Sequence, residues 1–286
     1  MLFRSTAFTE LPVAPWGRWL FVATLALAVA FQTGHIWRYT PLAPKEVQGS
    51  RGNDEGALVS IVISNVLQTN RDADLLFGVL RAVDADIVLC VETDDWWRER
   101  LDAFKATHPH TVQCPLSNTY GMLLYSRLPL HDTSVDFLIQ PDIPSIQARV
   151  ELRNRELVWL NCVHPRPPAP GESDESLERD AELLLVGKRV KDAEHPVIVC
   201  GDLNDVAWSR TTRLFQKTSR LVEPRKGRGL FNTFHAHVPV FRFPLDHIFH
   251  SDSFRLVLMR RLANVGSDHF PVHAVLSLEP SAEHEQ

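Results

Sequence analysis

Short apolar segments of this chain repeatedly end or begin at an acid, an amide or an imidazole. The residues at those points are Asn65, Glu92, His164, Asp202, Asn204, Asp246, Asp268 and His269. One polar group at the end of a strand is ordinary, because such residues form turns and caps. Leaving so many of them half-buried would be costly unless they bind a metal or one another. The pattern therefore predicts a fold that collects these strand ends along a single rim.

From residue 58 onward, segments with strand-like composition alternate with segments of helical periodicity. The predicted strands span residues 58–66, 86–91, 121–126, 134–139, 146–152, 156–164, 196–200, 245–250, 255–261 and 271–278. The predicted helices span residues 72–83, 94–104, 174–191 and 209–217. This alternation indicates an α/β fold. Cys90, Cys162 and Cys200 lie within the apolar segments, so we interpret them as core residues.

The polar strand ends have the chemistry of a site that hydrolyses phosphodiesters. Such a reaction needs a positive centre for the developing charge, a poised water and help for the leaving oxygen. Carboxylates and amides are oxygen ligands suited to Mg²⁺ or Mn²⁺, and imidazoles can carry protons or contact phosphate. A divalent ion on Glu92, a base at Asp202 and imidazoles at His164 and His269 would supply all of these functions.

Several short motifs occur in a fixed order along the same part of the chain. They are SN at 64–65, VE at 91–92, His164, GDLND at 201–205, LDHIF at 245–249 and SDHFPV at 267–272. In this combination the chain resembles the endonuclease/exonuclease/phosphatase superfamily, from Leu58 to Glu279. The resemblance implies a four-layer α/β sandwich, in which two β-sheets pack face to face and are flanked by helices. We expect this domain to span residues 58–286.

The resemblance also implies a metal site. Glu92 is expected to be the principal ligand of Mg²⁺ or Mn²⁺, and Asn65 and Asp268 are expected to complete the shell, partly through water. Several members of the superfamily carry a further acidic ligand where this chain has Leu67. That departure favours one firmly bound metal over two.

Catalytic roles follow from the same resemblance. Asp202 would orient or deprotonate the attacking water, and Asn204 would hold a phosphate oxygen. His269 would contact the scissile phosphate, oriented by Asp246 in a carboxylate–imidazole pair. His164 matches the additional histidine of the deoxyribonuclease and sphingomyelinase branches, whereas the abasic-site endonuclease branch has a tyrosine there.

An apolar stretch precedes the predicted domain. Residues 19–37 contain no Asp, Glu, Lys or Arg, and about 20 such residues are enough to cross a bilayer as a helix. Trp16, Trp19, Trp37 and Tyr39 lie where interfacial aromatic residues would be expected. The composition therefore favours a membrane-spanning helix.

We predict that residues 1–38 form a membrane anchor or signal segment, so that one N-terminal hydrophobic helix precedes the domain. The alternatives to an uncleaved, single-pass anchor are a cleaved signal peptide and a core helix of a soluble protein. Residues 39–57 are rich in proline, glycine and charge, which is typical of a linker. We expect the catalytic domain to lie outside the cytoplasm.

The net charge of −5 gives no sign of the basic surface that tight, non-specific nucleic-acid binders carry. A nuclease remains compatible with it, because bound cations neutralise the carboxylates of a metal site. Arg225, Lys226 and Arg228 could guide a phosphate-rich substrate, but we favour a solvated loop for them.

The leading functional prediction is a divalent-metal-dependent phosphodiesterase, most simply a nuclease acting on DNA or RNA. The membrane segment and the acidic balance favour a second candidate, a phosphoesterase of phospholipid head groups or inositol phosphates. A candidate of another class is a catalytically inactive, membrane-tethered binding module. The sequence identifies no protein partner.

Overall fold

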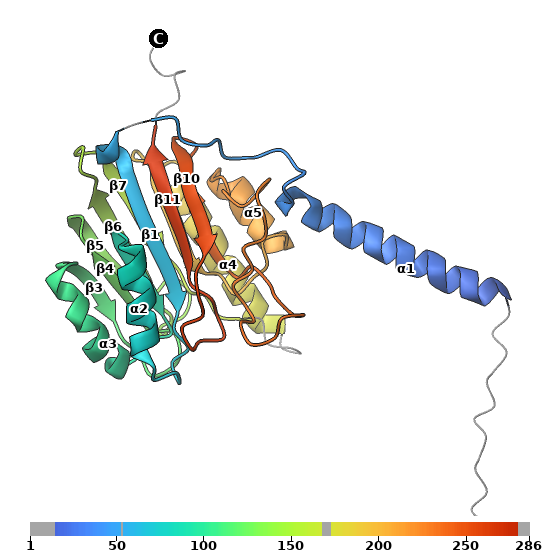
Figure 1. Ribbon diagram of the computed structural model, residues 1–286, viewed down its shortest axis with the longest axis horizontal. Coiled ribbons are helices and arrows are strands. Elements are labelled where there is room, and N and C mark those ends of the chain that lie inside the picture. Colours follow the sequence, from blue (N-terminus) through green and yellow to red (C-terminus); the bar gives the residue numbers. More distant parts are fainter. Residues whose placement is uncertain (1–14, 53, 168–172, 280–286) are drawn as a thin grey trace, which may run out of the picture.

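The computed structural model describes residues 15–52, 54–167 and 173–279. Residues 1–14 of the predicted anchor segment and 280–286 of the predicted domain lie outside these ranges. Within the described part, the chain from β1 onward forms two β-sheets that pack face to face, and a long helix projects from one side (Figure 1).

The first sheet has six strands in the order β10-β11-β1-β2-β4-β3. Its strands are β1 (Leu58–Asn65), β2 (Ile87–Val91), β3 (His110–Cys114), β4 (Met122–Ser126), β10 (Phe254–Arg261) and β11 (Val272–Leu278). At its centre β1 runs parallel to β2 and antiparallel to β11. Central strands of this kind are covered on both faces, which explains the continuous apolar composition of β1 and β2.

The second sheet has five strands in the order β5-β6-β7-β8-β9. Its strands are β5 (Leu130–Asp136), β6 (Ser145–Glu151), β7 (Leu157–Cys162), β8 (Val197–Asp202) and β9 (Asp246–His250). β7 and β8 are parallel, whereas β9 is antiparallel to β8. Each sheet therefore contains one parallel pair of strands, β1–β2 in the first sheet and β7–β8 in the second.

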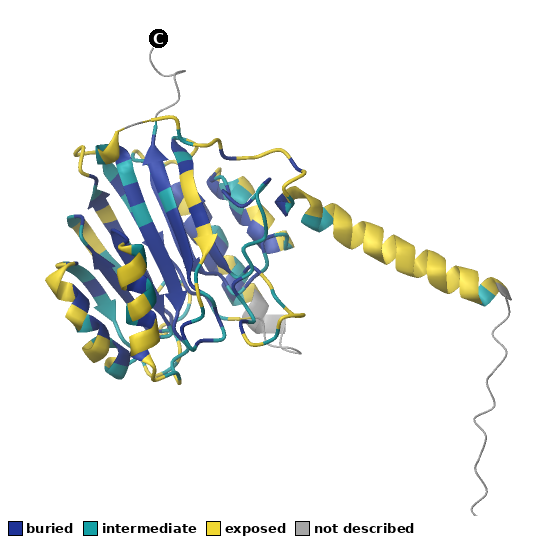
Figure 2. Cartoon of the chain, viewed as in Figure 1, coloured by how far each residue is buried: buried dark blue, intermediate teal, exposed yellow. Residues whose placement is uncertain are grey.

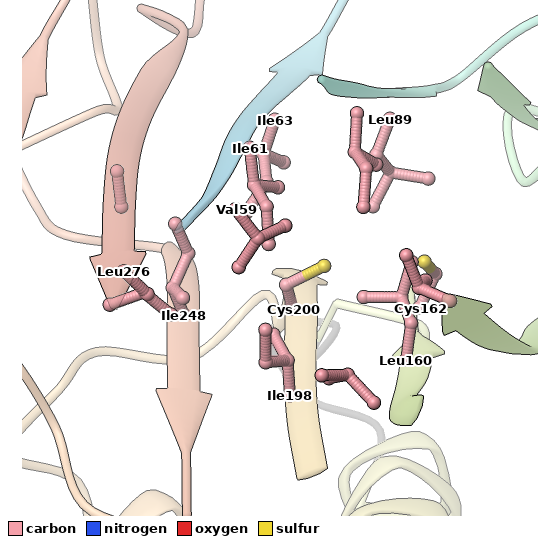
Figure 3. Close-up of a cluster of buried hydrophobic side chains, with 14 of the residues drawn as sticks. Val59, Ile61, Ile63, Leu89, Leu160, Cys162, Ile198, Cys200, Ile248 and Leu276 are labelled. Atoms are coloured by element: carbon pink, nitrogen blue, oxygen red, sulfur yellow. The ribbon is translucent and has the colours of Figure 1, made fainter. Parts of the chain in front are cut away.

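The main hydrophobic core lies between the two sheets (Figure 3). Ile61 and Ile63 of β1 project from one sheet towards Ile198 of β8 in the other. Cys162 and Cys200 are buried in this same layer, and Cys90 is buried on the other face of the first sheet. The prediction that these cysteines are core residues is confirmed.

Helices cover the outer faces of both sheets. On the six-stranded sheet lie α2 (Ala73–Val83) and α3 (Asp95–Leu101), whose buried residues include Leu76 and Trp97. On the five-stranded sheet lie α4 (Ser173–Val190) and α5 (Arg210–Ser219). The order helix, sheet, sheet, helix confirms the predicted four-layer sandwich.

Two strand predictions differ from the structure. The strand His110–Cys114 (β3) was not predicted, because its residues HTVQC lack a continuous apolar segment and it lies at a sheet edge. The strand predicted at 134–139 is β5, Leu130–Asp136, which begins earlier and contains a bulge between His131 and Ser134. Both strands are at sheet edges, where burial constrains the residue pattern least.

The predicted hydrophobic helix is α1 (Pro15–Ile36), and it is exposed along its length (Figure 2). The stretch Trp16–Tyr39 is long and apolar enough to cross a membrane, although a signal sequence would meet the same criterion. Short turns follow at η1 (Trp37–Tyr39) and η2 (Glu55–Ala57). Between α1 and β1 the chain lies along the domain, and Tyr39 and Val47 are buried there.

Adjacent leucines of α2 test the packing of this helix. Leu76 is fully buried under the first sheet, whereas the Leu75 side chain is 48% exposed. We expect Leu76→Ala to lower the free energy of unfolding by about 2–5 kcal/mol, because it leaves a cavity. Leu75→Ala should cost less than about 1 kcal/mol, since exposed substitutions change stability little. Urea unfolding of both variants measures the difference, and equal losses would contradict this packing.

Candidate active site

The polar strand ends meet at one rim because of the directions in which the strands run. β1 and β2 are parallel, so Asn65 at the end of β1 lies beside the end of β2, which Glu92 follows. β9 and β11 run antiparallel to their neighbours, so their first residues lie at the same rim. Asp246 opens β9 directly opposite Asp202, the last residue of β8, and His269 precedes β11. The predicted shared rim is therefore present.

Asn65 connects the two sheets at this rim. Its amide nitrogen donates hydrogen bonds to Glu92 Oε1 (2.7 Å) and to Asp202 Oδ2 (3.1 Å), while its oxygen accepts one from the Leu67 N–H (3.0 Å). Glu92 itself has a φ of 59° and Leu67 a φ of 56°. Non-glycine residues rarely adopt this left-handed conformation, and it is concentrated at functional sites.

Asp202 is fully buried at the centre of the group. Its Oδ1 accepts a hydrogen bond from the Asn204 N–H (2.9 Å), and its Oδ2 lies 3.6 Å from His269 Nε2 and 3.9 Å from His164 Nε2. Burial would raise the pKa of Asp202, but the charges of His269 and His164 outweigh it and lower the pKa below its usual value. The Asp202 carboxylate is therefore held ionised between two imidazoles.

His269 and Asp246 form the predicted carboxylate–imidazole pair. His269 Nδ1 donates a hydrogen bond to Asp246 Oδ2 (2.9 Å), and both side chains are buried. Burial lowers the pKa of His269, but the Asp202 and Asp246 carboxylates oppose this and raise it to about 10. Burial raises the pKa of Asp246, an effect that the charge of His269 partly offsets. The pair therefore holds a proton on the imidazole across the neutral pH range.

His164 follows β7, and its Nε2 lies 3.9 Å from the Asp202 carboxylate, which His269 also contacts. Its side chain is 2% exposed, and the Tyr120 ring lies 5.5 Å from the imidazole, measured between centroids. His164 Nδ1 is buried without a hydrogen-bond partner among the described residues. Buried polar atoms of this kind are costly, which indicates that the site is built to receive a ligand.

The two remaining predicted residues lie at the margin of the group. Asn204 has a φ of 50°, and its amide nitrogen donates to the Pro165 carbonyl (3.0 Å). Asp268 is half-buried, and its carboxylate accepts a weak hydrogen bond from the neighbouring Ser267 hydroxyl (3.4 Å). Asp268 acts on the group through its charge, which contributes to the raised pKa of the neighbouring His269 imidazole.

Sequence reasoning missed Arg179 of α4. Its guanidinium is buried, donates to the Asn204 carbonyl (3.3 Å) and lies 3.9 Å from the Asp205 carboxylate. It therefore supports the loop that follows β8. No sequence signal distinguishes this arginine from the other charges of α4, because its role depends on how the helix packs against the loop.

The rim contains a possible metal site. The ligand atoms of Asp202, Asp246 and His269 all lie within 4.8 Å of one another. The predicted ligand set was different, namely Asn65, Glu92 and Asp268, and the first two are in direct contact with each other. The two sets adjoin through the hydrogen bond between Asn65 and Asp202.

Comparison with known proteins identifies the class of this one. Residues 47–269 match the model of the endonuclease/exonuclease/phosphatase family. The chain belongs to this family and is a phosphoesterase, a metal-dependent hydrolase. Among curated proteins, no sequence matches this chain.

Solved structures share the fold at low sequence identity. A D. rerio TDP2 crystallised with a single strand DNA product is 16% identical, with a TM-score of 0.64 over 77% of this chain and 99% of that one. A protein from Beutenbergia cavernae is 18% identical, with a TM-score of 0.64 over 78% and 72% of the two chains. The Staphylococcus aureus beta toxin is 16% identical, with a TM-score of 0.57 over 76% and 99%.

The raised pKa of His269 predicts a pH-dependent contribution to stability. A histidine has a pKa of about 6.5 when unfolded, below the folded value of about 10. Its contribution is therefore complete below about pH 6.5 and is lost as the pH rises towards about 10. We expect the stability difference between the wild type and His269→Gln, measured in EDTA, to decline over that interval.

The exposed His131 provides the control for this measurement. Its ring pairs with Glu151 at the surface (2.9 Å), and exposed pairs contribute little to stability. His131→Gln should therefore change the free energy of unfolding by less than about 1 kcal/mol throughout the interval. A difference for His269→Gln that stays constant or grows with pH would contradict the assigned charge of that imidazole.

Proposed function

We propose that this protein is a divalent-metal-dependent phosphodiesterase that cleaves DNA or RNA. The observation that carries the proposal is the buried Asp202 carboxylate held between the imidazoles of His164 and His269. An ionised carboxylate can take a proton from an attacking water. A protonated imidazole can stabilise the charge that develops on a phosphate or supply a proton to the leaving oxygen.

The residues that would hold Mg²⁺ or Mn²⁺ are Glu92 and Asn65, with Asp268 as a further ligand through water. Their oxygen donors suit these ions. We favour this set over Asp202, Asp246 and His269, because the Asp202 and Asp246 carboxylates raise the pKa of His269 to about 10, and a doubly protonated imidazole cannot bind a metal. The bound ion would neutralise charge on the phosphate. Leucine at position 67 supports a single ion.

The remaining residues position these groups. Asp246 keeps the His269 imidazole protonated and in a fixed orientation through the 2.9 Å hydrogen bond. Asn204 sits at the edge of the group with its amide available to turn from the Pro165 carbonyl to a phosphate oxygen. All the positions that the chemistry needs are filled, which argues against the inactive binding module.

A nucleic acid is the first choice of substrate. The D. rerio TDP2 structure, which shares this fold, contains a single strand DNA product. Asp268 and Asn204 at the margin of the rim are half-buried, so we place the approach of the substrate on their side. Specificity would then come from the loops around a common catalytic rim.

A phospholipid head group is the second candidate, and an exposed apolar loop favours it. Val240 is 81% exposed and Phe241 is 64% exposed. Their loop adjoins the catalytic group, because Phe234 forms a backbone bridge with His269 and the Ala236 N–H donates to the Asp268 carbonyl (2.6 Å). Apolar side chains beside a catalytic rim could rest on a lipid surface.

We also propose that α1 anchors the protein as a single-pass membrane helix, with the catalytic domain outside the cytoplasm. The support is its length, its apolar composition and its exposure, since none of its membrane-length window is buried against the domain. An exposed apolar surface of this size requires a partner, and a bilayer is the simplest one.

Hydrolysis tests the catalytic assignment. The full chain should cleave plasmid DNA, RNA, sphingomyelin, a phosphoinositide or a bis-aryl phosphodiester with Mg²⁺ or Mn²⁺ and stop in EDTA. We expect Asp202→Asn to lower turnover by about 100-fold or more, because the variant lacks the base. Asp252→Asn, at a side chain that is 76% exposed, is the matched control. Wild-type turnover in Asp202→Asn, or activity in EDTA, would refute the mechanism, and the substrate that is cleaved decides between the candidates.

Membrane extraction tests the anchor. The wild-type chain should stay in the membrane pellet after an alkaline carbonate wash and should retain residues 1–38 by intact mass. Leu25→Lys combined with Val29→Lys should be released, because each charge in mid-span costs about 3 kcal/mol. A shortened mass would instead identify a cleaved signal peptide, and release of the intact wild type would show that α1 does not span.

A further inference from the structure

A buried polar network lies behind the catalytic pair. It consists of Tyr39, Glu223, Arg225 and His247, and each of these side chains is at most 2% exposed. The Tyr39 hydroxyl lies 3.3 Å from Glu223 Oε2, and Glu223 forms an ion pair with Arg225. Arg225 in turn donates to His247 Nδ1. The expectation that Arg225 lies in a solvated loop is wrong, because its loop folds inward against β9.

The network reaches the active site through the backbone of β9. Arg225 Nη1 donates to the carbonyl of Asp246 (3.3 Å), the residue that binds His269. His247, the next residue, donates from Nε2 to the carbonyl of Asp205 (2.9 Å) in the loop after β8. Arg225 and His247 therefore hold together the two chain segments that carry Asp246 and Asp202.

Tyr39 connects the same network to the segment that follows α1. Its hydroxyl lies 2.6 Å from the carbonyl of Ala207, to which it donates, in the loop after β8. Around it, the Gly227 N–H donates to the Arg38 carbonyl (2.9 Å), and the Glu223 N–H donates to the Glu46 carboxylate (2.7 Å). The segment predicted to be a linker is thus hydrogen-bonded to the loop that contains Arg225.

The close contact at Gly227 restricts how the segment after α1 can pack against the loop that contains Arg225. Gly227 has a φ of 76°, and a side chain there would meet the backbone of Lys45 at 2.7 Å. Only glycine fits both the left-handed conformation and the close approach. The segment after α1 and the loop at Arg225 are therefore built to fit against each other.

A network of this kind is an inefficient way to gain stability. Taking two charges out of water costs about as much as their attraction returns, and apolar residues of similar size often stabilise a protein more. A buried ion pair does, however, impose a definite geometry on the groups that it contacts. The groups that this network contacts are the backbone carbonyls of Asp246, which lies opposite Asp202, and of Asp205, in the loop that follows Asp202.

We propose that Tyr39, acting through Glu223 and Arg225, is a positioning residue for the Asp246–His269 pair, so that the segment following α1 is part of the active-site framework. The inference rests on the proposed hydrolytic function of that pair. This role differs from a purely structural one, because Tyr39, just after α1, would determine the geometry of the Asp246–His269 pair and not only the stability of the fold.

Two matched tyrosine variants test this inference in the full chain. Tyr39→Phe removes a buried hydroxyl that donates to the Ala207 carbonyl and lies 3.3 Å from Glu223 Oε2. Tyr125→Phe is the control, because its hydroxyl is also buried and also contacts two polar groups on the outer face of the first sheet: it accepts from Gln113 (3.0 Å) and donates to Asp102 (3.3 Å). Both variants should lose similar thermal stability. Only Tyr39→Phe should lower kcat, by about tenfold with KM changed less than about twofold.

Arg225→Lys is a second, independent variant. Lysine keeps the charge but cannot contact Glu223, His247 and the Asp246 carbonyl at once. We expect it to lower kcat further than Tyr39→Phe does. If Tyr39→Phe matched Tyr125→Phe in both kcat and stability, the positioning role would be refuted.

A readout without substrate separates this inference from the proposed function. The His269 Nδ1 proton, which is donated to Asp246, can be observed by NMR in ¹⁵N-histidine-labelled chain and assigned by its loss in His269→Gln. Tyr39→Phe should shift or broaden this resonance, and Tyr125→Phe should leave it unchanged. If the wild type hydrolyses no phosphodiester, the proposed function fails while the resonance still decides the inference. An unchanged resonance in Tyr39→Phe would overturn it.

Discussion

The rest of this structure depends on two buried carboxylates that face each other across neighbouring strands. Asp202 and Asp246 are paired in register on β8 and β9, and neither is exposed. Such a pair is unfavourable by itself, because burial and mutual repulsion both oppose ionisation. The His269 imidazole resolves the conflict by contacting both, at 2.9 Å from Asp246 and 3.6 Å from Asp202.

The two-sheet architecture is what makes that contact possible. His269 precedes β11 of the first sheet, whereas its two carboxylate partners belong to the second. Asn65, also from the first sheet, donates to Asp202 and Glu92 and so joins the sheets at the same rim. The apolar layer between the sheets therefore does more than stabilise the fold. It brings the two halves of the polar rim within hydrogen-bonding distance.

The segment between α1 and β1 adds a second layer of support behind this rim. Tyr39 and Val47 are buried against the domain, and the Arg228 guanidinium donates to the Val47 carbonyl (2.6 Å). If α1 crosses a bilayer, as proposed, the catalytic rim is tied to the membrane surface by a packed segment instead of a free tether. The distance and orientation of the rim relative to the bilayer would then be restricted.

The sequence by itself determined the α/β class and nearly all the residues of the rim, because polar groups interrupt apolar segments where strands end. Resemblance to a family then supplied the four layers and the pairing of His269 with Asp246. Only the tertiary structure decided the contacts of Arg179, Arg225 and Tyr39, since each donates to a residue far away in the chain. A lone arginine in a polar segment looks the same whether water or a buried glutamate surrounds it. Its burial depends on how separate segments pack, which no local pattern records.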